Sequence, residues 1–333
     1  MGTGKRILAF LALAAALTAW GLRPARATDV WTPDTGDVKL EELPRDTAEA
    51  QFRHASALIA AGQAKSGVNI LRSLLKDNPK ADWAEKAHYT LALGLFVEGK
   101  YEDAFEEWQE FRMRHPLSES GPAALDMQLA AANQLAREDL DPALKLYDRL
   151  LVLAPDKEFE ARCQKDKADA MLAAGKPLEA SHEYLALIDY HPDSQWVPYA
   201  WYRIAQCYLA TAKWIGRGSQ YLEDAGRGYQ DYLDSFPNHA MAEQAKQELS
   251  EVRALQAQTY MEAAYYYLGP GRKPTAALAY ISLTKEAVPG SAQSRWADEK
   301  TREVLAGEQA PLRGQVQKMP LKGVSAPKPQ EPK

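Results

Sequence analysis

The sequence predicts an all-α protein, a right-handed α-solenoid of about six helical hairpins followed by a C-terminal capping helix. Two observations predict this fold. Six amphipathic stretches each end at a proline, and these prolines are 37, 39, 37, 45 and 52 residues apart, at Pro79, Pro116, Pro155, Pro192, Pro237 and Pro289. No stretch shows the apolar–polar alternation that is typical of a strand. A recurring period of this length indicates a chain built from repeated helical units.

Residues at fixed distances before these prolines repeat by type. Twelve residues before each proline stands a small residue: Gly67, Ala104, Ala143, Ala180, Ala225 or Ala277. Eight residues before it stands a large apolar or aromatic residue: Leu71, Trp108, Tyr147, Tyr184, Tyr229 or Ile281. Residues four apart share one face of a helix, so the small residue admits a neighbouring helix and the large one fills the space beside it. We therefore expect these residues to pack the hairpins together.

Each repeat also predicts a first helix upstream of the one that ends at the proline. Clear examples are residues 84–97, 159–173 and 199–212. Gly99-Lys100 and Gly175-Lys176 would join the two helices of a hairpin, because glycine favours the left-handed C-cap of a helix. Helix–turn–helix units of about 34 residues are the tetratricopeptide norm, and these hairpins resemble that type.

Two repeats depart from the regular length. Residues 214–221, rich in Gly and Arg, predict an insertion in the fifth repeat, and the sixth has a long first helix at about 240–268. Residues 294–305 predict the capping helix that a solenoid needs at its end. The expected organisation is hairpins 1 to 3 over residues 47–155, then hairpins 4 to 6 with the cap over residues 156–310.

The first 27 residues resemble a signal peptide. Lys5 and Arg6 precede an apolar run over residues 7–22, and Ala25 and Ala27 form a small-x-small cleavage site. This run is shorter than the roughly 20 residues of a membrane-spanning helix. We expect cleavage after Ala27, with an uncleaved anchor as the alternative. The expected location is the periplasm, peripheral to the outer membrane.

Charge is unevenly distributed along the chain. Residues 28–310 hold 31 Lys and Arg against 44 Asp and Glu, whereas residues 311–333 hold five basic residues and one acidic residue. The acidic body argues against nucleic-acid binding, which needs a basic face. The Pro- and Lys-rich tail at 311–333 is expected to be disordered, and its charge suits contact with an anionic cell wall or lipid. Residues 28–46 are expected to form an extended lead-in.

No residue pattern indicates catalysis, a metal ion or a cofactor. The six histidines lack the spacing of a zinc site: His54, His88, His115, His182, His191 and His239. No phosphate-binding loop or nucleophile motif occurs in a strand–turn–helix context. The repeat places Cys163 and Cys207 at different heights on neighbouring helices, which favours two buried free thiols over a disulfide. We therefore expect a protein that is not an enzyme and needs no cofactor.

Two aromatic clusters leave alternatives open. Four tyrosines near the end of the long helix either pack beneath the sixth hairpin or form a partner surface: Tyr260, Tyr265, Tyr266 and Tyr267. Tyrosine suits both roles, and three consecutive side chains cannot all face one side. For Trp201, Tyr202 and Trp214, close to the insertion, a core position is favoured.

Several features of residues 177–302 occur together and in order. A helix over 180–192 ends in His-Pro, the sequence Tyr-Ala-Trp-Tyr-Arg at 199–203 precedes the insertion, and residues 229–237 lead into a long helix that ends in Ala-Ala-Tyr-Tyr-Tyr at 263–267. In these features the segment resembles the family of the outer-membrane protein assembly factor BamD. The resemblance covers about 40% of the chain.

This resemblance implies a periplasmic subunit of the β-barrel assembly machine. Its C-terminal hairpins would dock on the barrel insertase, and its N-terminal hairpins would meet unfolded outer-membrane clients. Arg253 on the long helix, together with the four tyrosines, forms the set of candidate partner-binding residues. Members of the family carry a lipidated cysteine just after the signal, whereas the first cysteine here is Cys163. The alternative is a different envelope adaptor, in a cell-wall or trans-envelope complex; a cell-wall lyase is disfavoured because no room remains for a catalytic domain.

Overall fold

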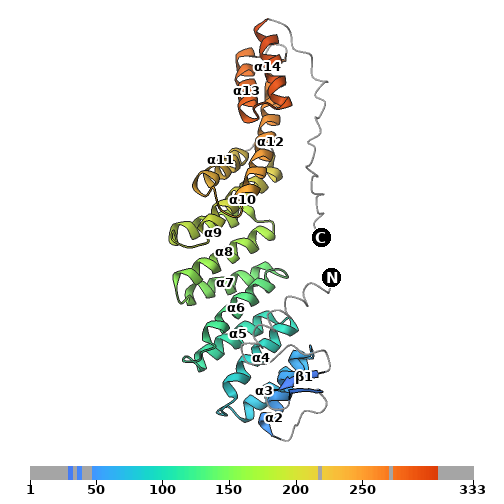
Figure 1. Cartoon of the computed structure of the whole chain (residues 1–333), viewed down its shortest axis with the longest axis vertical. Helices are drawn as coiled ribbons and strands as arrows, with labels where there is room; N and C mark the ends of the chain where they lie inside the picture. The colour runs from blue at the N-terminus through green and yellow to red at the C-terminus, as the bar shows by residue number, and fades with distance from the viewer. Residues whose placement is uncertain (1–28, 33–35, 40–46, 217–219, 270–272, 307–333) are drawn as a thin grey trace. The chain divides into compact units, whose positions relative to one another are not determined.

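The computed structural model describes residues 29–32, 36–39, 47–216, 220–269 and 273–306, and within them thirteen helices follow one another as six hairpins and a final helix (Figure 1). The helices are α2 (Ala48–Ala60), α3 (Ala64–Asp77), α4 (Ala84–Glu98), α5 (Tyr101–Arg114), α6 (Gly121–Leu135), α7 (Leu140–Leu153), α8 (Lys157–Ala173), α9 (Pro177–Tyr190), α10 (Val197–Ile215), α11 (Gln220–Ser235), α12 (Ala242–Leu268), α13 (Pro274–Ala287) and α14 (Ala292–Leu305). The all-α solenoid predicted from the sequence is confirmed.

The second helix of every hairpin ends two residues before its proline. Helix α3 ends at Asp77, before Pro79, and the same interval holds for α5, α7, α9, α11 and α13. Proline lacks a backbone N–H and disfavours helical geometry in the residue before it. The prolines that define the repeat in the sequence therefore set these helix ends in the structure.

Other helix ends depend on glycine or on a side-chain cap. Gly99 follows α4 with φ 83°, and Gly175 lies in the turn after α8 with φ 77°, a left-handed backbone that glycine adopts without strain. At the start of α8 the Asp156 carboxylate accepts a hydrogen bond of 2.8 Å from the backbone N–H of Phe159. This contact satisfies one of the N–H groups that a helix N-terminus leaves unpaired.

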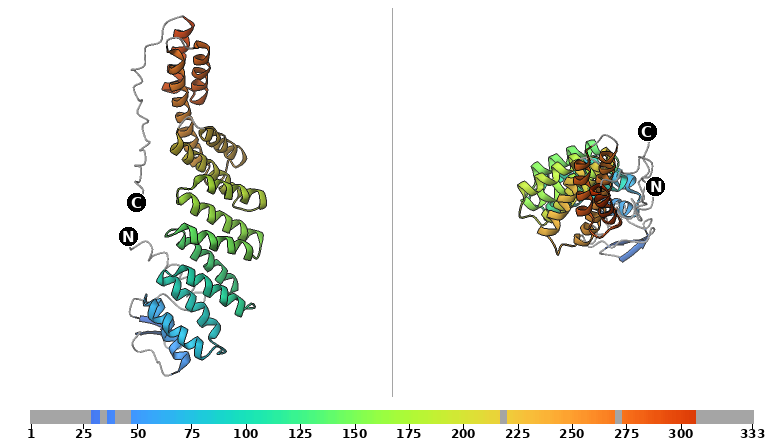
Figure 2. Two further views of the ribbon diagram at one scale, coloured as in Figure 1. Left: turned by 180° about the vertical axis from the view of Figure 1, so that it is seen from behind. Right: turned by 90° about the horizontal axis from the view of Figure 1, so that it is seen from above.

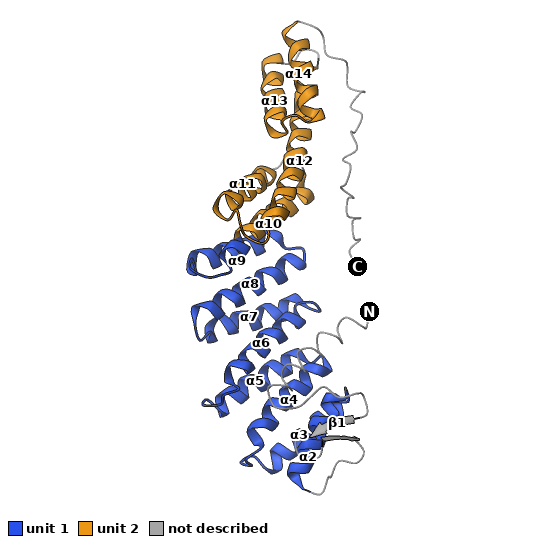
Figure 3. Cartoon of the chain, viewed as in Figure 1, with its two compact units in different colours: residues 1–200 blue, residues 201–333 orange. Residues whose placement is uncertain are grey.

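The chain divides into two compact units, residues 1–200 and residues 201–333, each coloured separately in Figure 3. In the first unit each helix contacts the next, and first helices of successive hairpins also touch, α2 with α4 and α6 with α8. The hairpins of this unit therefore lie side by side, with their first helices in one layer (Figure 2). In the second unit α11, α12, α13 and α14 pack in chain order. The division near residue 155 stays a prediction.

The residues expected to pack the hairpins lie in the interior of the units. Five small residues have 0% exposed surface: Ala104, Ala143, Ala180, Ala225 and Ala277. Four aromatic residues are at most 1% exposed: Trp108, Tyr147, Tyr184 and Tyr229. A Cβ atom at Gly67 would lie 2.6 Å from the carbonyl oxygen of Ala55, so α3 approaches α2 too closely for any side chain there.

Aromatic rings fill the middle of the first unit's core. The ring of Trp108 lies 6.3 Å from that of Tyr89 and 5.9 Å from that of Phe96, in edge-on and tilted arrangements. Such pairs add favourable quadrupole contacts to the burial of apolar area. In the second unit, Thr284 is buried, and its hydroxyl donates a 2.9 Å hydrogen bond to the Tyr280 carbonyl.

The expectation that Trp214 lies in the core is wrong. Its side chain is 85% exposed, whereas Tyr202 is 2% exposed and Trp201 is half-buried. The expectation rested on residue type, since large aromatic residues are mostly buried. Trp214 stands in the last turn of α10, beside the insertion, and this position leaves its ring in contact with solvent.

Part of the expected lead-in forms a short β-hairpin, although the sequence shows no strand pattern. Strand β1 (Asp29–Thr32) pairs antiparallel with β2 (Gly36–Lys39), and Val30 lies opposite Val38. Runs of four residues are too short for alternation to be recognised in the sequence. The predicted signal peptide and the basic tail at 311–333 lie outside the described residues.

Cys163 and Cys207 are both buried and are not joined in a disulfide, as predicted. The Cys163 thiol donates a long 3.6 Å hydrogen bond to the Tyr147 carbonyl, and burial raises the pKa of this thiol, which keeps it protonated. Within the described ranges, no helix combines the length and apolar character that crossing a bilayer requires.

The burial of His88 in α4 makes the free energy of unfolding depend on pH. It is 7% exposed, and its Nδ1 atom has no hydrogen-bond partner among the described residues. Burial, reinforced by the charge of Arg114, lowers the pKa of His88 from 6.5 to about 4. Above pH 6.5 the imidazole is neutral in the folded and the unfolded chain. Between pH 6.5 and 4 the unfolded chain takes up the proton first, so stability falls.

We predict that His88→Leu reduces this loss. The drop in the free energy of unfolding between pH 7.5 and pH 4.5 should be about 2 kcal/mol smaller than in the wild type, allowing for the water that still reaches the imidazole. Urea titrations at the two pH values measure the drop, with exposed His182→Leu as the control. An equal drop in the wild type and in His88→Leu would contradict the prediction.

Candidate functional site

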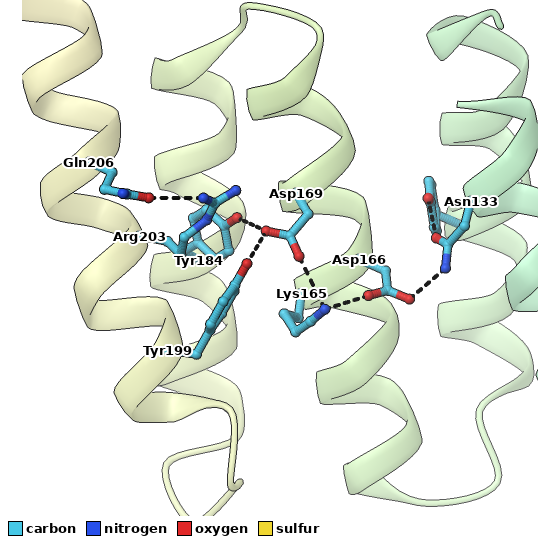
Figure 4. Close-up of polar contacts among 9 residues, drawn as sticks. Asn133, Lys165, Asp166, Asp169, Tyr184, Tyr199, Arg203 and Gln206 are labelled. Atoms are coloured by element: carbon cyan, nitrogen blue, oxygen red, sulfur yellow. Dashed lines mark hydrogen bonds and ion pairs between the residues drawn. The ribbon is translucent and has the colours of Figure 1, made fainter. Parts of the chain in front are cut away.

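A chain of polar contacts crosses the first helices of neighbouring hairpins in the first unit (Figure 4). We call it the ladder and define it by seven residues on α6, α7, α8, α9 and the start of α10: Asn133, Tyr147, Lys165, Asp166, Asp169, Tyr184 and Tyr199. It is the candidate site because its groups are charged, half-buried and held in place by one another.

Lys165 stands at the centre of the ladder. Its Nζ atom donates to Asp166 Oδ1 at 2.7 Å and to Asp169 Oδ2 at 3.1 Å, and the three side chains are 15%, 16% and 26% exposed. Burial alone would lower the pKa of Lys165, but the two carboxylates outweigh it and the pKa is raised. One ammonium between two carboxylates leaves this part of the ladder with a net negative charge.

On the α6 side, the ladder continues through an amide to a tyrosine. Asn133 Nδ2 donates to Asp166 Oδ2 at 2.8 Å, and the Tyr147 hydroxyl donates to Asn133 Oδ1 at 2.5 Å. Burial, with Asp166 nearby, raises the pKa of Tyr147, so the hydroxyl stays protonated and remains a donor. A buried polar chain of this kind is stabilising only when each member has a partner, and here each does.

On the α10 side, two tyrosines share one carboxylate. The hydroxyls of Tyr184 and Tyr199 both donate to Asp169 Oδ1, the latter at 2.6 Å. The Lys165 ammonium also lies 4.9 Å from the ring centre of Trp196 and 5.4 Å from that of Tyr199. These cation–π contacts hold the ammonium where its charge is only partly hydrated.

The opposite face of α8 holds a second lysine between two carboxylates. Lys167 Nζ lies 2.9 Å from Asp148 on α7 and 2.8 Å from Glu183 on α9, and its side chain is 12% exposed. This pair of contacts ties three consecutive helices together. Lys167 is two residues from Lys165, so it lies on the other side of α8 and is not part of the ladder.

The candidate partner-binding residues on α12 have neighbours in the second unit. Arg253 is exposed and donates to Gln230 at 2.8 Å, Tyr265 accepts a 2.7 Å hydrogen bond from the Trp296 indole, and Tyr267 stacks on Tyr280 with ring centres 5.7 Å apart. Tyr260 also lies against Tyr280, at 6.4 Å, and Tyr266 is 44% exposed. Three of the four tyrosines, Tyr260, Tyr265 and Tyr267, therefore pack against other residues of the second unit. A partner role for the set stays a prediction.

Sequence reasoning did not find the ladder. Its charged and amide members stand at unremarkable positions of the first helices α6 and α8, where polar residues usually face water: Asn133, Lys165, Asp166 and Asp169. A signal was nevertheless present: the residue eight before the proline is tyrosine in repeats three and four, and an amide or carboxylate, Asn133 or Asp169, stands 14 or 15 residues before it. A hydroxyl on a core aromatic needs a partner, and these residues supply it.

A ladder hydrogen bond should contribute measurably to stability. We predict that Tyr147→Phe lowers the free energy of unfolding by about 1 kcal/mol, because Asn133 loses its donor in a half-buried place. Thermal melts followed by circular dichroism measure the change. Tyr190→Phe, whose ring is 73% exposed, is the control and should melt like the wild type; a Tyr147→Phe melt equal to both would show that the bond contributes nothing.

Residues 49–81, which span α2 and α3, match the model of the tetratricopeptide repeat family. The first hairpin is therefore of the tetratricopeptide type, and repeats of this type generally serve protein–protein interaction rather than catalysis. None of the curated proteins compared with the chain matches it significantly. In the described part of the chain, no cluster of three or more His, Cys, Asp or Glu residues could hold a metal ion.

Several solved tetratricopeptide proteins are similar to the chain. The C-terminal part of a repeat protein from Cytophaga hutchinsonii is 12% identical with a TM-score of 0.39, covering 78% of this chain and 90% of that one. A protein from Parabacteroides merdae is 11% identical with a TM-score of 0.36, covering 78% and 98%. One from Thermus thermophilus is 17% identical with a TM-score of 0.31, covering 62% and 98%. Likenesses at this level say nothing about activity or partners.

Proposed function

We propose that the protein is a non-catalytic scaffold of the cell envelope, which binds partner proteins during the assembly of outer-membrane β-barrel proteins. The observation that carries the binding role is the ladder: charged and hydroxyl groups on the first helices of successive hairpins, fixed before any partner arrives. Groups that are already ordered lose little conformational entropy on binding, so more of the contact energy appears as affinity.

The envelope part of the proposal rests on the sequence. Residues 1–27 resemble a signal peptide, and residues 177–302 resemble the BamD family. In this proposal the hairpins of the second unit dock on the barrel insertase through exposed side chains of α12, among them Arg253 and Tyr266. The ladder of the first unit receives client proteins, and the basic tail at 311–333 contacts the cell wall or lipid.

A second candidate function is an adaptor for a different envelope complex, in cell-wall synthesis or across the envelope. One observation favours it: the BamD family's lipidated cysteine has no counterpart here, since the first cysteine, Cys163, is buried in α8. The two candidates share the same binding surface and differ only in the partner.

Photo-crosslinking in intact cells tests both. p-Benzoylphenylalanine replaces Ala173, which is exposed on α8 one turn beyond Asp169 and on the same face. The control is the same residue at Lys145, exposed on α7, the second helix of hairpin 3. Residue 173 should capture envelope proteins that residue 145 does not, and mass spectrometry identifies them. The barrel insertase or unfolded barrel proteins support the first candidate, another envelope complex supports the second, and equal capture from both positions contradicts the ladder as a binding surface.

A further inference from the structure

A groove of about 740 Å³ runs along the turns that join hairpins 2 to 5 in the first unit. We call it the turn groove. Its walls come from three successive proline turns and from the first turns of α6 and α8, with the apolar surfaces of Pro116, Leu125, Pro155 and Phe159 among them. This is a volume suited to a peptide segment, since ligand sites commonly enclose several hundred Å³ and have mostly apolar walls.

The carboxylates of the turn groove already have partners. Asp126 pairs with the Arg162 guanidinium, and Asp156 caps α8 by accepting from the Phe159 N–H at 2.8 Å. Glu158 accepts a 2.7 Å hydrogen bond from Gln195. Each of these carboxylates therefore has a hydrogen-bond donor, and Asp126 also faces a cation.

By contrast, several hydrogen-bond donors of the turn groove lack a carboxylate partner, or any acceptor at all, within the described part of the chain. The Arg112 guanidinium donates only to the neutral Gln128 amide, at 3.1 Å, and forms no ion pair with any carboxylate of the described residues. His115 Nε2, Arg162 Nε and Trp196 Nε1 are cut off from water and have no hydrogen-bond partner among the described residues. Arg112 is also half-buried, and burial lowers its pKa. A half-buried guanidinium without a carboxylate is unusual in a chain body with 44 acidic against 31 basic residues.

We propose that the turn groove binds an extended segment of a partner protein that carries one carboxylate side chain among apolar residues. The carboxylate pairs with the Arg112 guanidinium beside His115, at the side of the groove formed by the end of α5 and the turn that follows it. Apolar flanking residues cover the proline turns. The chain's own tail does not fit this description, because residues 311–333 carry five basic residues and one glutamate.

The turn groove is distinct from the ladder, although Trp196 borders both: one face of its ring lies under Lys165, while its N–H is unpaired. The test below is made with purified protein and peptides, so its failure leaves the crosslinking experiment on the ladder unaffected.

Three labelled heptapeptide pools test the proposal on the full chain by fluorescence anisotropy. Their central residue is Glu, Gln or Lys, and their flanking residues are drawn from Ala, Leu and Pro. The Glu pool should bind about tenfold more tightly than the Gln pool, the gain expected from a charge-assisted bidentate contact. Equal binding of the two pools, or a preference for the Lys pool, would overturn the proposal, and the latter would point to a basic segment such as the tail.

Substitutions of Arg112 test whether its guanidinium binds the peptide carboxylate. Arg112→Gln should bring binding of the Glu pool down to that of the Gln pool, and Arg112→Lys should retain part of the preference. Arg114→Gln is the matched control, since Arg114 is an exposed arginine two residues away that pairs with Glu110 at 2.6 Å. Unchanged selectivity in Arg112→Gln, with a helical spectrum like the wild type, would overturn the proposal.

Discussion

Ala143→Arg is expected to lower the free energy of unfolding by about 3 to 5 kcal/mol. Ala143 has 0% exposed surface in α7, twelve residues before Pro155, where α7 contacts its neighbours in the first unit's core. The longer side chain cannot be accommodated without moving a helix, and a buried guanidinium would have no carboxylate partner. Ala180→Arg, at the equivalent position of α9, should behave in the same way.

Chemical denaturation followed by circular dichroism measures this loss, and hydrogen exchange shows whether it is confined to the hairpins around α7. Ala123→Arg is the matched control: Ala123 is exposed at the start of α6, the helix that pairs with α7. If Ala143→Arg and Ala123→Arg unfold at the same denaturant concentration, the small residues do not set the helix contacts.

Trp108→Ala should be nearly as damaging, at about 4 kcal/mol, because it leaves a cavity in the most aromatic part of the core. The Trp108 indole is 0% exposed and lies within 6.3 Å of the rings of both Tyr89 and Phe96. Its Nε1–H has no hydrogen-bond partner among the described residues. The indole ring therefore contributes through its volume and its ring contacts.

Trp108→Phe separates these contributions, since it keeps an aromatic ring and removes the N–H. It should cost about half as much as Trp108→Ala or less, as measured by the same denaturation experiment. A Trp108→Phe variant as unstable as Trp108→Ala would mean that the indole N–H has a role that these contacts do not explain.

The sequence predicted much of the fold because each repeat carries three independent signals. A proline ends a helix for reasons local to the backbone, and the helix end follows it at a constant interval of two residues. The small residue at Ala143 and the aromatic at Tyr147 describe a contact between neighbouring helices, and neighbours in a solenoid are also neighbours in sequence. Short-range patterns therefore suffice for the helices and for their order.

The candidate sites could not be predicted in the same way. The ladder depends on which face of α8 meets α6 and α10, and periodicity alone does not distinguish a half-buried Asp169 from a solvated one. The turn groove depends on a guanidinium, Arg112, that has no carboxylate partner among the described residues, and a missing ion pair is visible only once every neighbour is placed. Trp214 shows that residue type alone does not predict burial, because its apolar ring at the end of α10 is exposed to solvent.

The thiol of Cys163 offers a way to time the opening of a single hairpin. It has 0% exposed surface, and a thiol that is buried and protonated reacts with alkylating reagents only after the surrounding helices separate. With Cys207 replaced by serine, the rate of modification would report how often α8 leaves its neighbours, without unfolding the rest of the molecule. The same rate, measured with a bound partner, would show how strongly binding closes that hairpin.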